Sequence, residues 1–322
     1  MNKYVGNPKQ LFEARQYIMS DGKAAGVRAI DVWNGAGLFF TVLADRCLDL
    51  YTVRYKNKNM SFLTPTGVVA PAYYNDRGPG WLRSFFGGFL TTCGLQNIGV
   101  GDNSDETTPM HGRISSTPAE NLCVKLSPEE DAVEISGIMR EAVLFGARLK
   151  LERTIRCRAG IDAIELEDVI TNTGYERAPI SMLYHFNIGY PMLSEAAEIV
   201  IPAEKTIPRD EHAKEGLDEW DKVLPPQPGW VEMCYYHTLS ENTFGIDNPE
   251  IGARLRISFE SDGLLDRLVQ WRQLGEGDYV TGLEPASCTL DGRADAVANG
   301  SQKYIDAGSS YKNRFRITFS EL

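Results

Sequence analysis

The sequence lacks the motifs of common nucleotide- and metal-dependent enzymes. There is no phosphate loop of the G-x-x-x-x-G-K type, and Gly99-Val100-Gly101 lacks the third glycine of a dinucleotide site. No G-x-S-x-G nucleophile elbow is present. The four histidines never occur with H-x-H or H-E-x-x-H spacing, which argues against a zinc site. We therefore expect a protein that needs neither a metal nor a cofactor.

Cysteines and long apolar runs are also scarce. The cysteines stand singly, without a C-x-x-C pair, and this spacing argues against a zinc ribbon or a thioredoxin-type site. No apolar run approaches the roughly 20 residues that a bilayer span needs. The N-terminal stretch from Met1 to Lys23 has no apolar core typical of a secretory signal. We expect a cytoplasmic protein with reduced, mostly buried thiols. The cysteines are Cys47, Cys93, Cys123, Cys157, Cys234 and Cys288.

Acidic residues outnumber basic residues in the sequence. The formal net charge is -11 and the sequence pI is about 5.0, and no basic stripe stands out. This balance argues against binding to nucleic acid or to an anionic membrane, and mildly against a polyanionic substrate. It leaves open whether the chain forms a homodimer. A neutral small molecule is the partner that the composition favours.

The main pattern in the sequence is a two-residue alternation of apolar and polar side chains. In Leu149–Arg158, Leu149, Leu151, Ile155 and Cys157 share one face, and charged residues share the other. Many such segments, with turn residues between them and few helical periods, predict an all-β fold, a large antiparallel β-sandwich. With 322 residues and 43% hydrophobic content, we expect one domain over residues 1–322. Further predicted strands are Gly37–Leu43, Ala132–Met139, Ile164–Thr171 and Tyr311–Phe319.

Two segments carry more specific expectations. Arg254–Glu260 and Leu264–Gln273 resemble a strand pair joined by the turn Glu260-Ser261-Asp262-Gly263. Ala203–Trp230 is predicted to leave the sheets, with a short helix within Asp210–Lys222. Long excursions of this kind are uncommon unless they cover or line a site.

His185 is the strongest single candidate for chemistry. Alternation in Ile180–Asn187 places His185 and Asn187 on the same face of one strand. Histidine can give or take a proton near neutral pH. The alternative is a structural histidine that bonds a neighbouring carbonyl group.

A second cluster follows a glycine- and threonine-rich stretch. His111-Gly112-Arg113 places a proton carrier and a planar fork of donors beside a flexible backbone, which suits a hydroxyl-covered ligand. A loop histidine bonded to backbone is the alternative for His111. The acidic run Asp102–Glu106 lacks the spacing of a calcium-binding loop and is predicted to be a solvated loop.

Glu284 stands in the apolar string Y-V-T-G-L-E-P, where a carboxylate is costly without a role or a partner. Burial would raise its pKa, as a general base requires. The alternative is a salt bridge to Arg272 or Arg113. Just upstream, Trp271 and Arg272 could supply a flat apolar platform and a donor fork for a sugar.

Two further arginines are candidate ligand contacts. Arg46, between Asp45 and Asp49, is either an ion-paired strand-end residue or a substrate contact. With Arg83 and Arg113, it could supply charge for a phosphorylated sugar.

Four strings resemble one known family: G-G-F-L-T-T-C-G-L, H-G-R-I at His111, Y-H-F-N-I-G-Y-P around His185, and W-R…Y-V-T-G-L-E-P at Glu284. They are similar to the aldose 1-epimerase (galactose mutarotase-like) superfamily, and more specifically to its branch known as domain of unknown function 4432. The resemblance extends from about Gly22 to the C-terminus. It implies a β-supersandwich that binds a sugar in a cleft on one sheet.

The resemblance also implies roles. His185 would protonate the ring oxygen of a sugar and Glu284 would take the proton of the anomeric hydroxyl group. His111 would be the second histidine, and Arg113 and Asn187 would contact the sugar. Two other functions remain open: a related isomerase acting on another sugar, and a carbohydrate-binding protein without catalysis. The family's usual asparagine-histidine-threonine string is replaced here, and its substrate-binding aspartate has no clear counterpart.

Overall fold

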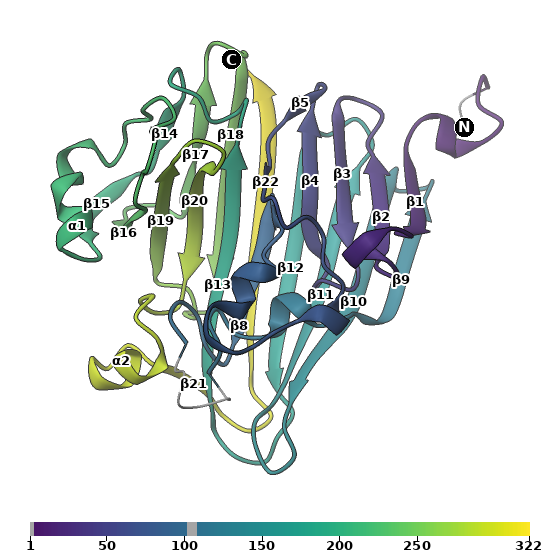
Figure 1. Ribbon diagram of the computed structural model, residues 1–322. Coiled ribbons are helices and arrows are strands. Elements are labelled where there is room, and N and C mark those ends of the chain that lie inside the picture. The colour runs from purple at the N-terminus through teal and green to yellow at the C-terminus, as the bar shows by residue number, and fades with distance from the viewer. Residues whose placement is uncertain (1–2, 102–107) are drawn as a thin grey trace.

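The computed structural model describes residues 3–101 and 108–322, whose regular secondary structure is mainly antiparallel strands (Figure 1). The acidic run at Asp102–Glu106 lies outside the described residues. Within the described ranges, no helix is long and apolar enough to cross a membrane. All six cysteines are free, and five of them are buried.

The strands form three large sheets and a two-stranded ribbon. The five-stranded sheet contains β1 (Glu13–Ile18), β2 (Arg28–Trp33), β3 (Leu38–Leu43), β4 (Asp49–Tyr55) and β5 (Lys58–Asn59). The eight-stranded sheet runs in the order β14 (Glu198–Val200), β17 (Thr243–Asn248), β18 (Ala253–Ser261), β22 (Ser310–Glu321), β12 (Ala163–Asn172), β11 (Arg148–Arg158), β10 (Ala132–Ala142) and β9 (Glu120–Ser127). The seven-stranded sheet contains β15 (Ala203–Pro208), β16 (Met233–Leu239), β19 (Arg267–Leu274), β20 (Tyr279–Ala286), β13 (Ala178–Gly189) and β21 (Lys303–Ile305), with β8 (Leu90–Leu95) paired to β13. The ribbon is β6 (Phe62–Leu63) with β7 (Gly87–Gly88).

Helices are few and short. The α-helices are α1 (Glu211–Glu215) and α2 (Arg293–Ala298), and the 3-10 helices are η1 (Pro8–Gln10), η2 (Gly22–Ala24), η3 (Pro71–Tyr73), η4 (Gly78–Arg83), η5 (Ile114–Ser116) and η6 (Leu217–Glu219).

The sheets face one another across one apolar core. In Figure 1, β9 to β12 (teal) lie behind β2 to β4 (purple). Buried side chains from all three large sheets form a single cluster, including Phe40, Leu151, Phe186 and Phe315. The predicted all-β antiparallel sandwich is therefore confirmed.

Alternation correctly predicted the faces of the central strand β13. Its even-numbered side chains, from Ile180 to Ile188, join the main core between the sheets. Leu183 packs into a second cluster on the other side of the strand, and His185 shares that side. One side of β13 therefore stabilises the fold while the other is free to carry a site.

The predicted pairing of Arg254–Glu260 with Leu264–Gln273 is wrong. β18 pairs with β17 and β22 in the eight-stranded sheet, whereas β19 pairs with β16 and β20 in the seven-stranded sheet. The connection crosses the core, where Leu264 and Leu265 are buried. Burying these two apolar side chains stabilises the connection, whereas a solvent-exposed hairpin turn would leave them in water.

The segment Ala203–Trp230 leaves the sheet later than predicted. Its first six residues form the edge strand β15, which pairs with β16. Asp210 then caps α1 by accepting a hydrogen bond from the Ala213 N–H at 2.8 Å. The helix ends at Gly216, well before Lys222. Backbone carbonyl groups of the rest accept hydrogen bonds from β19 side chains, which ties the segment to the sheet.

A buried ion network joins the sheets. Arg153 of β11 contacts Asp49 of β4 at 2.8 Å and Asp168 of β12 at 2.7 Å, and all three side chains are fully buried. The Tyr184 hydroxyl of β13 donates to Asp168 at 2.7 Å, and Thr92 of β8 accepts from Arg153 at 2.9 Å. Every large sheet thus contributes a polar group to one water-excluded cluster.

Removing the cation of this network should destabilise the fold strongly. Arg153→Met leaves two buried carboxylates unpaired, which should cost about 3–5 kcal/mol in the free energy of unfolding. Burial raises the pKa of Asp49 to about 6, so urea denaturation should be measured at pH 8, where this carboxylate is charged. The control Arg140→Met breaks the exposed pair with Glu120 and should cost less than about 1 kcal/mol. Equal losses for the two variants would contradict the central role of Arg153.

Candidate functional site

Two neighbouring strands place His185 and Glu284 side by side. The register pairs Leu183 with Ala286 and Phe186 with Leu283, so His185 lies opposite Glu284. His185 Nε2 lies 3.3 Å from Glu284 Oε1, and both side chains are almost fully buried. Gly282 leaves room for the carboxylate, because a Cβ atom there would collide with it. The structure thus brings together the two residues predicted to be catalytic.

His111 reaches the same place from a loop. Its peptide N–H donates to the Gly99 carbonyl group at 2.9 Å, and its own carbonyl group accepts from the Gly94 N–H at 3.1 Å. Gly112 has a φ of 71° and lies against Gly94, where a side chain would collide with backbone. This tight docking holds the His111 ring 5.8 Å from the His185 ring, measured between centroids.

Aromatic side chains wall the pocket around the three residues. Trp81 stacks on Phe85 with 4.5 Å between ring centroids, and it lies 4.5 Å from the His111 ring. Trp271 stands edge-on to His185 at 5.4 Å. The cavity has a volume of about 310 Å³, which suits a small molecule. Its walls also include Leu82, Gly99, Val100, Met110, Arg209, Glu232, Cys234 and Leu290.

Burial shifts the acid–base behaviour of the site. Loss of solvent, reinforced by the neighbouring His111, lowers the pKa of His185 to about 3. Burial and the charge of Arg209 lower the pKa of His111 to about 4. Burial raises the pKa of Glu284 well above its ordinary range, as predicted. Burial thus favours the neutral form of both groups.

Trp271 lines the pocket as predicted, whereas Asn187 and Arg113 lie outside its walls. Asn187 is fully buried and donates to the backbone carbonyl groups of Gly87 and His185, at 3.1 and 2.9 Å. These hydrogen bonds join β13 to the backbone at Gly87. Arg113 points to Asp76, with 3.0 Å between Nη2 and Oδ2. Neither side chain lines the pocket, and their roles as sugar contacts stay predictions.

The structure also places Arg46, Arg83 and Arg272 away from the pocket. Arg46 is buried and donates to the backbone carbonyl groups of Ser115, Val69 and Ser84. Arg83 is exposed and lines a separate shallow cavity. Arg272 donates to the Lys222 carbonyl group at 2.9 Å and lies over the Trp230 ring. These three arginines fasten backbone segments or face solvent, which corrects their prediction as substrate contacts.

Sequence analysis missed two charged residues of the pocket wall, Arg209 and Glu232. Glu232 accepts a hydrogen bond from the Trp271 indole N–H at 2.7 Å and so fixes the orientation of that ring. Arg209 belongs to Ala203–Trp230, the excursion that was predicted to cover or line a site. That expectation pointed to the segment that contains Arg209, but it identified no particular residue.

A model of the family described as domain of unknown function 4432 (DUF4432) matches residues 24–319. The chain belongs to this family. Its fold is shared with solved structures of galactose mutarotase-like proteins, as the motifs predicted.

Solved structures show how widely the fold of this DUF4432 protein is shared. It is similar to a candidate aldose 1-epimerase of Klebsiella pneumoniae, with a TM-score of 0.90 and 24% identity over 97% of this chain and 86% of that chain. A galactose 1-epimerase of Lactobacillus acidophilus has a TM-score of 0.62 and 13% identity over 96% and 99%. A candidate mutarotase of Salmonella typhimurium has a TM-score of 0.63 and 11% identity over 97% and 95%. At such identities the similarity shows the fold alone. No curated protein matches the chain.

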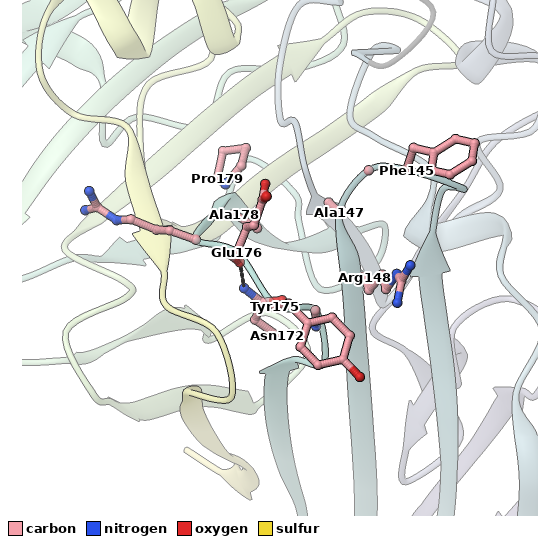
Figure 2. Close-up of a pocket in the computed structure, with 11 residues that line it drawn as sticks. Phe145, Ala147, Arg148, Asn172, Tyr175, Glu176, Ala178 and Pro179 are labelled. Atoms are coloured by element: carbon pink, nitrogen blue, oxygen red, sulfur yellow. Dashed lines mark hydrogen bonds between the residues drawn. The ribbon is translucent and has the colours of Figure 1, made fainter.

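A second cavity of the DUF4432 protein offers a useful contrast. It has a volume of about 420 Å³ and lies where the β10–β11 and β12–β13 connections meet (Figure 2). Phe145 and Tyr175 at its edge are 93% and 89% exposed. It contains no histidine, and Glu176 there is joined to Asn172 through its backbone carbonyl group. Proton-transfer groups therefore gather in the His185 pocket and not in this one.

The arrangement of the His185 pocket suits proton transfer. A histidine and a carboxylic acid in contact can exchange one proton and deliver it to either of two nearby oxygen atoms. No group of three or more His, Cys, Asp or Glu residues able to hold a metal ion occurs in ranges 3–101 and 108–322. That the protein needs no cofactor stays a prediction.

The buried Glu284 should make stability depend on pH. Its folded-state pKa exceeds the unfolded value of about 4.3, so the folded state holds the proton more tightly. The wild type therefore loses stability as pH rises above that value, by up to about 1.4 kcal/mol per pH unit. Glu284→Gln lacks this loss.

The free energy of unfolding of Glu284→Gln minus that of the wild type should thus increase between pH 5 and pH 8 in urea denaturation. Glu241→Gln, which removes an exposed carboxylate, serves as the matched control and should follow the wild-type curve. A difference between Glu284→Gln and the wild type that stays constant with pH would contradict the buried, proton-holding carboxyl group.

Proposed function

We propose that the protein is an aldose 1-epimerase-like isomerase that interconverts the anomers of a sugar. The observation that supports it best is the 3.3 Å contact between His185 Nε2 and Glu284 Oε1 at the base of an aromatic-walled pocket. The ring oxygen and the anomeric hydroxyl group of a cyclic sugar are attached to the same carbon. Two proton-transfer groups this close can contact both oxygen atoms at once.

The reaction needs only proton transfer and one reversible bond cleavage. Glu284 as carboxylate removes the proton of the anomeric hydroxyl group while protonated His185 gives a proton to the ring oxygen. The bond between the anomeric carbon and the ring oxygen breaks, leaving an open-chain aldehyde. Rotation about the adjacent carbon–carbon bond presents the other face, and the reverse transfers close the ring. The proton lost by one oxygen is gained by the other, so the pair carries the same total charge before and after.

The opposite pKa shifts of the pair fit this cycle. Moving a proton from Glu284 to His185 creates an imidazolium and a carboxylate in contact, and each charge stabilises the other. Burial excludes bulk water, which strengthens that interaction and shields the open-chain form. His111, held by its backbone contacts to Gly94 and Gly99, is a further polar contact for the ring.

The walls support a sugar as the ligand. Trp81, Phe85 and Trp271 present flat apolar surfaces to the C–H groups of a pyranose, and His111, Arg209 and Glu232 offer polar contacts to its hydroxyl groups. The solved structures of similar fold, among them the galactose 1-epimerase of Lactobacillus acidophilus, add support by analogy.

Removing either proton-transfer group should slow the exchange of anomers. We expect Glu284→Gln and His185→Asn each to lower kcat by about 10²–10⁴-fold on the preferred aldose. Magnetisation-transfer NMR on a panel of free aldoses measures this exchange directly at equilibrium. Glu241→Gln again provides a control with the same chemical change outside the pocket. Wild-type activity that survives both pocket substitutions would overturn the proposal.

The same experiment separates two other functions. A product other than the anomer would indicate a related isomerase that uses the same pair on an open-chain sugar. Saturable sugar binding without accelerated exchange in the wild type would indicate a carbohydrate-binding protein.

A further inference from the structure

Arg209 is the one positively charged arginine or lysine side chain among the described residues that line the His185 pocket. It follows the edge strand β15, and its peptide N–H donates to the Cys234 carbonyl group of β16 at 3.0 Å. The side chain is 21% exposed, so solvent reaches part of it. Its backbone is therefore fixed to the sheet, although the residue lies at the start of the Arg209–Trp230 connection.

A chain of hydrogen bonds sets the orientation of the guanidinium group. Arg209 Nε donates to Asp291 Oδ1 at 3.2 Å. The other oxygen of Asp291 accepts from the Tyr236 hydroxyl group at 3.4 Å, and that hydroxyl group accepts from the Leu290 N–H at 3.0 Å. Both carboxylate oxygens are thus engaged, and the Nε edge of Arg209 is committed to Asp291. The two Nη groups are the remaining donors of this side chain.

A thiol lines the same pocket. Cys234 belongs to its wall together with Arg209, and sulfur is a poor hydrogen-bond acceptor. The charge of Arg209 is also felt at the proton-transfer groups, because it lowers the pKa of His111 and opposes the rise in the pKa of Glu284. A hydroxyl oxygen that entered the pocket would be a better partner than the thiol.

The charges around Arg209 favour a neutral group over an anion. Asp291 offsets its charge from one side, and Glu232 stands on the same wall. A carboxylate or phosphate ligand at Arg209 would be repelled by the charges of both acidic residues. A neutral hydroxyl group can accept from Arg209 without that repulsion.

We propose that Arg209, positioned by Asp291, determines substrate specificity by donating a hydrogen bond to a hydroxyl group of a neutral aldose away from its anomeric carbon. The inference rests on the proposed function, which assigns the two oxygen atoms of the anomeric carbon to His185 and Glu284. The other hydroxyl groups then face the remaining walls of the pocket, to which Arg209 belongs.

A cycle that combines substitution with removal of single hydroxyl groups tests this contact. The substrates are the best aldose of the wild type and its monodeoxy derivatives, and the proteins are the wild type and Arg209→Gln. One deoxy sugar should lower kcat/KM of the wild type by about 10- to 100-fold, as expected for a hydrogen bond to a charged group. In Arg209→Gln the same deletion should change kcat/KM less than about threefold, because the partner is already missing.

Two further variants sharpen the result. Asp291→Asn removes the group that positions Arg209 and should raise KM while leaving kcat close to the wild-type value. Lys214→Gln removes a cation from the same connection outside the pocket and should leave the whole deoxy series unchanged. Dissociation constants of the same sugars, measured by calorimetry, give a second cycle that does not depend on turnover.

The outcomes separate this inference from the proposed function. Accelerated exchange in the wild type, with equal deoxy-sugar losses in wild type and Arg209→Gln, would overturn the role of Arg209 alone. A preference for a uronic acid that Arg209→Gln abolishes would overturn the neutral-ligand assignment. If no aldose exchanges faster, the proposed catalysis fails, and the binding cycle still decides whether Arg209 contacts a hydroxyl group.

Discussion

The buried contact of Arg153 with Asp49 and Asp168 is the constraint on which the rest of the structure depends. It joins β4, β11 and β12, and through the Tyr184 hydroxyl group it reaches β13. Because neighbouring side chains of a strand point to opposite sides, anchoring Tyr184 on the core side also sets where His185 points. A polar cluster without solvent tolerates little movement, since any shift leaves a charge unpaired. The strand that carries the site is thus held from behind.

The pocket exploits the same exclusion of water in a different way. In the core, one arginine contacts two buried carboxylates. In the pocket, the aromatic walls keep solvent from a histidine and a carboxyl group, and burial drives both toward their neutral forms. The site therefore costs the fold stability at neutral pH, which the apolar core and the ion network must offset. Gly282 shows how closely the local sequence is fitted to this arrangement, because only a residue without a side chain leaves space for the Glu284 carboxylate.

The sequence predicted what depends on neighbours along the chain and missed what depends on distant ones. Alternation identified β11 and the faces of β13, and the cost of a carboxylate in an apolar string pointed to Glu284. Nothing local reveals that β18 and β19 lie in different sheets, because both halves of that connection have the pattern of a hairpin. Arg46 was ambiguous for the same reason. Its carbonyl partners come from three separate segments, so its structural role exists only in the folded chain.

The placement of Arg209 suggests how this fold separates catalysis from specificity. His185 and Glu284 lie on adjacent strands inside the seven-stranded sheet, where a change of position would disturb pairing on both sides. Arg209 and Asp291 lie at the ends of connections, after β15 and before α2, where backbone can change without breaking a central strand. A change at Arg209 or Asp291 can therefore alter a ligand contact without disturbing the pairing around His185 and Glu284. Under the proposed function, the proton-transfer pair sets the class of reaction, and Arg209 selects the sugar that undergoes it.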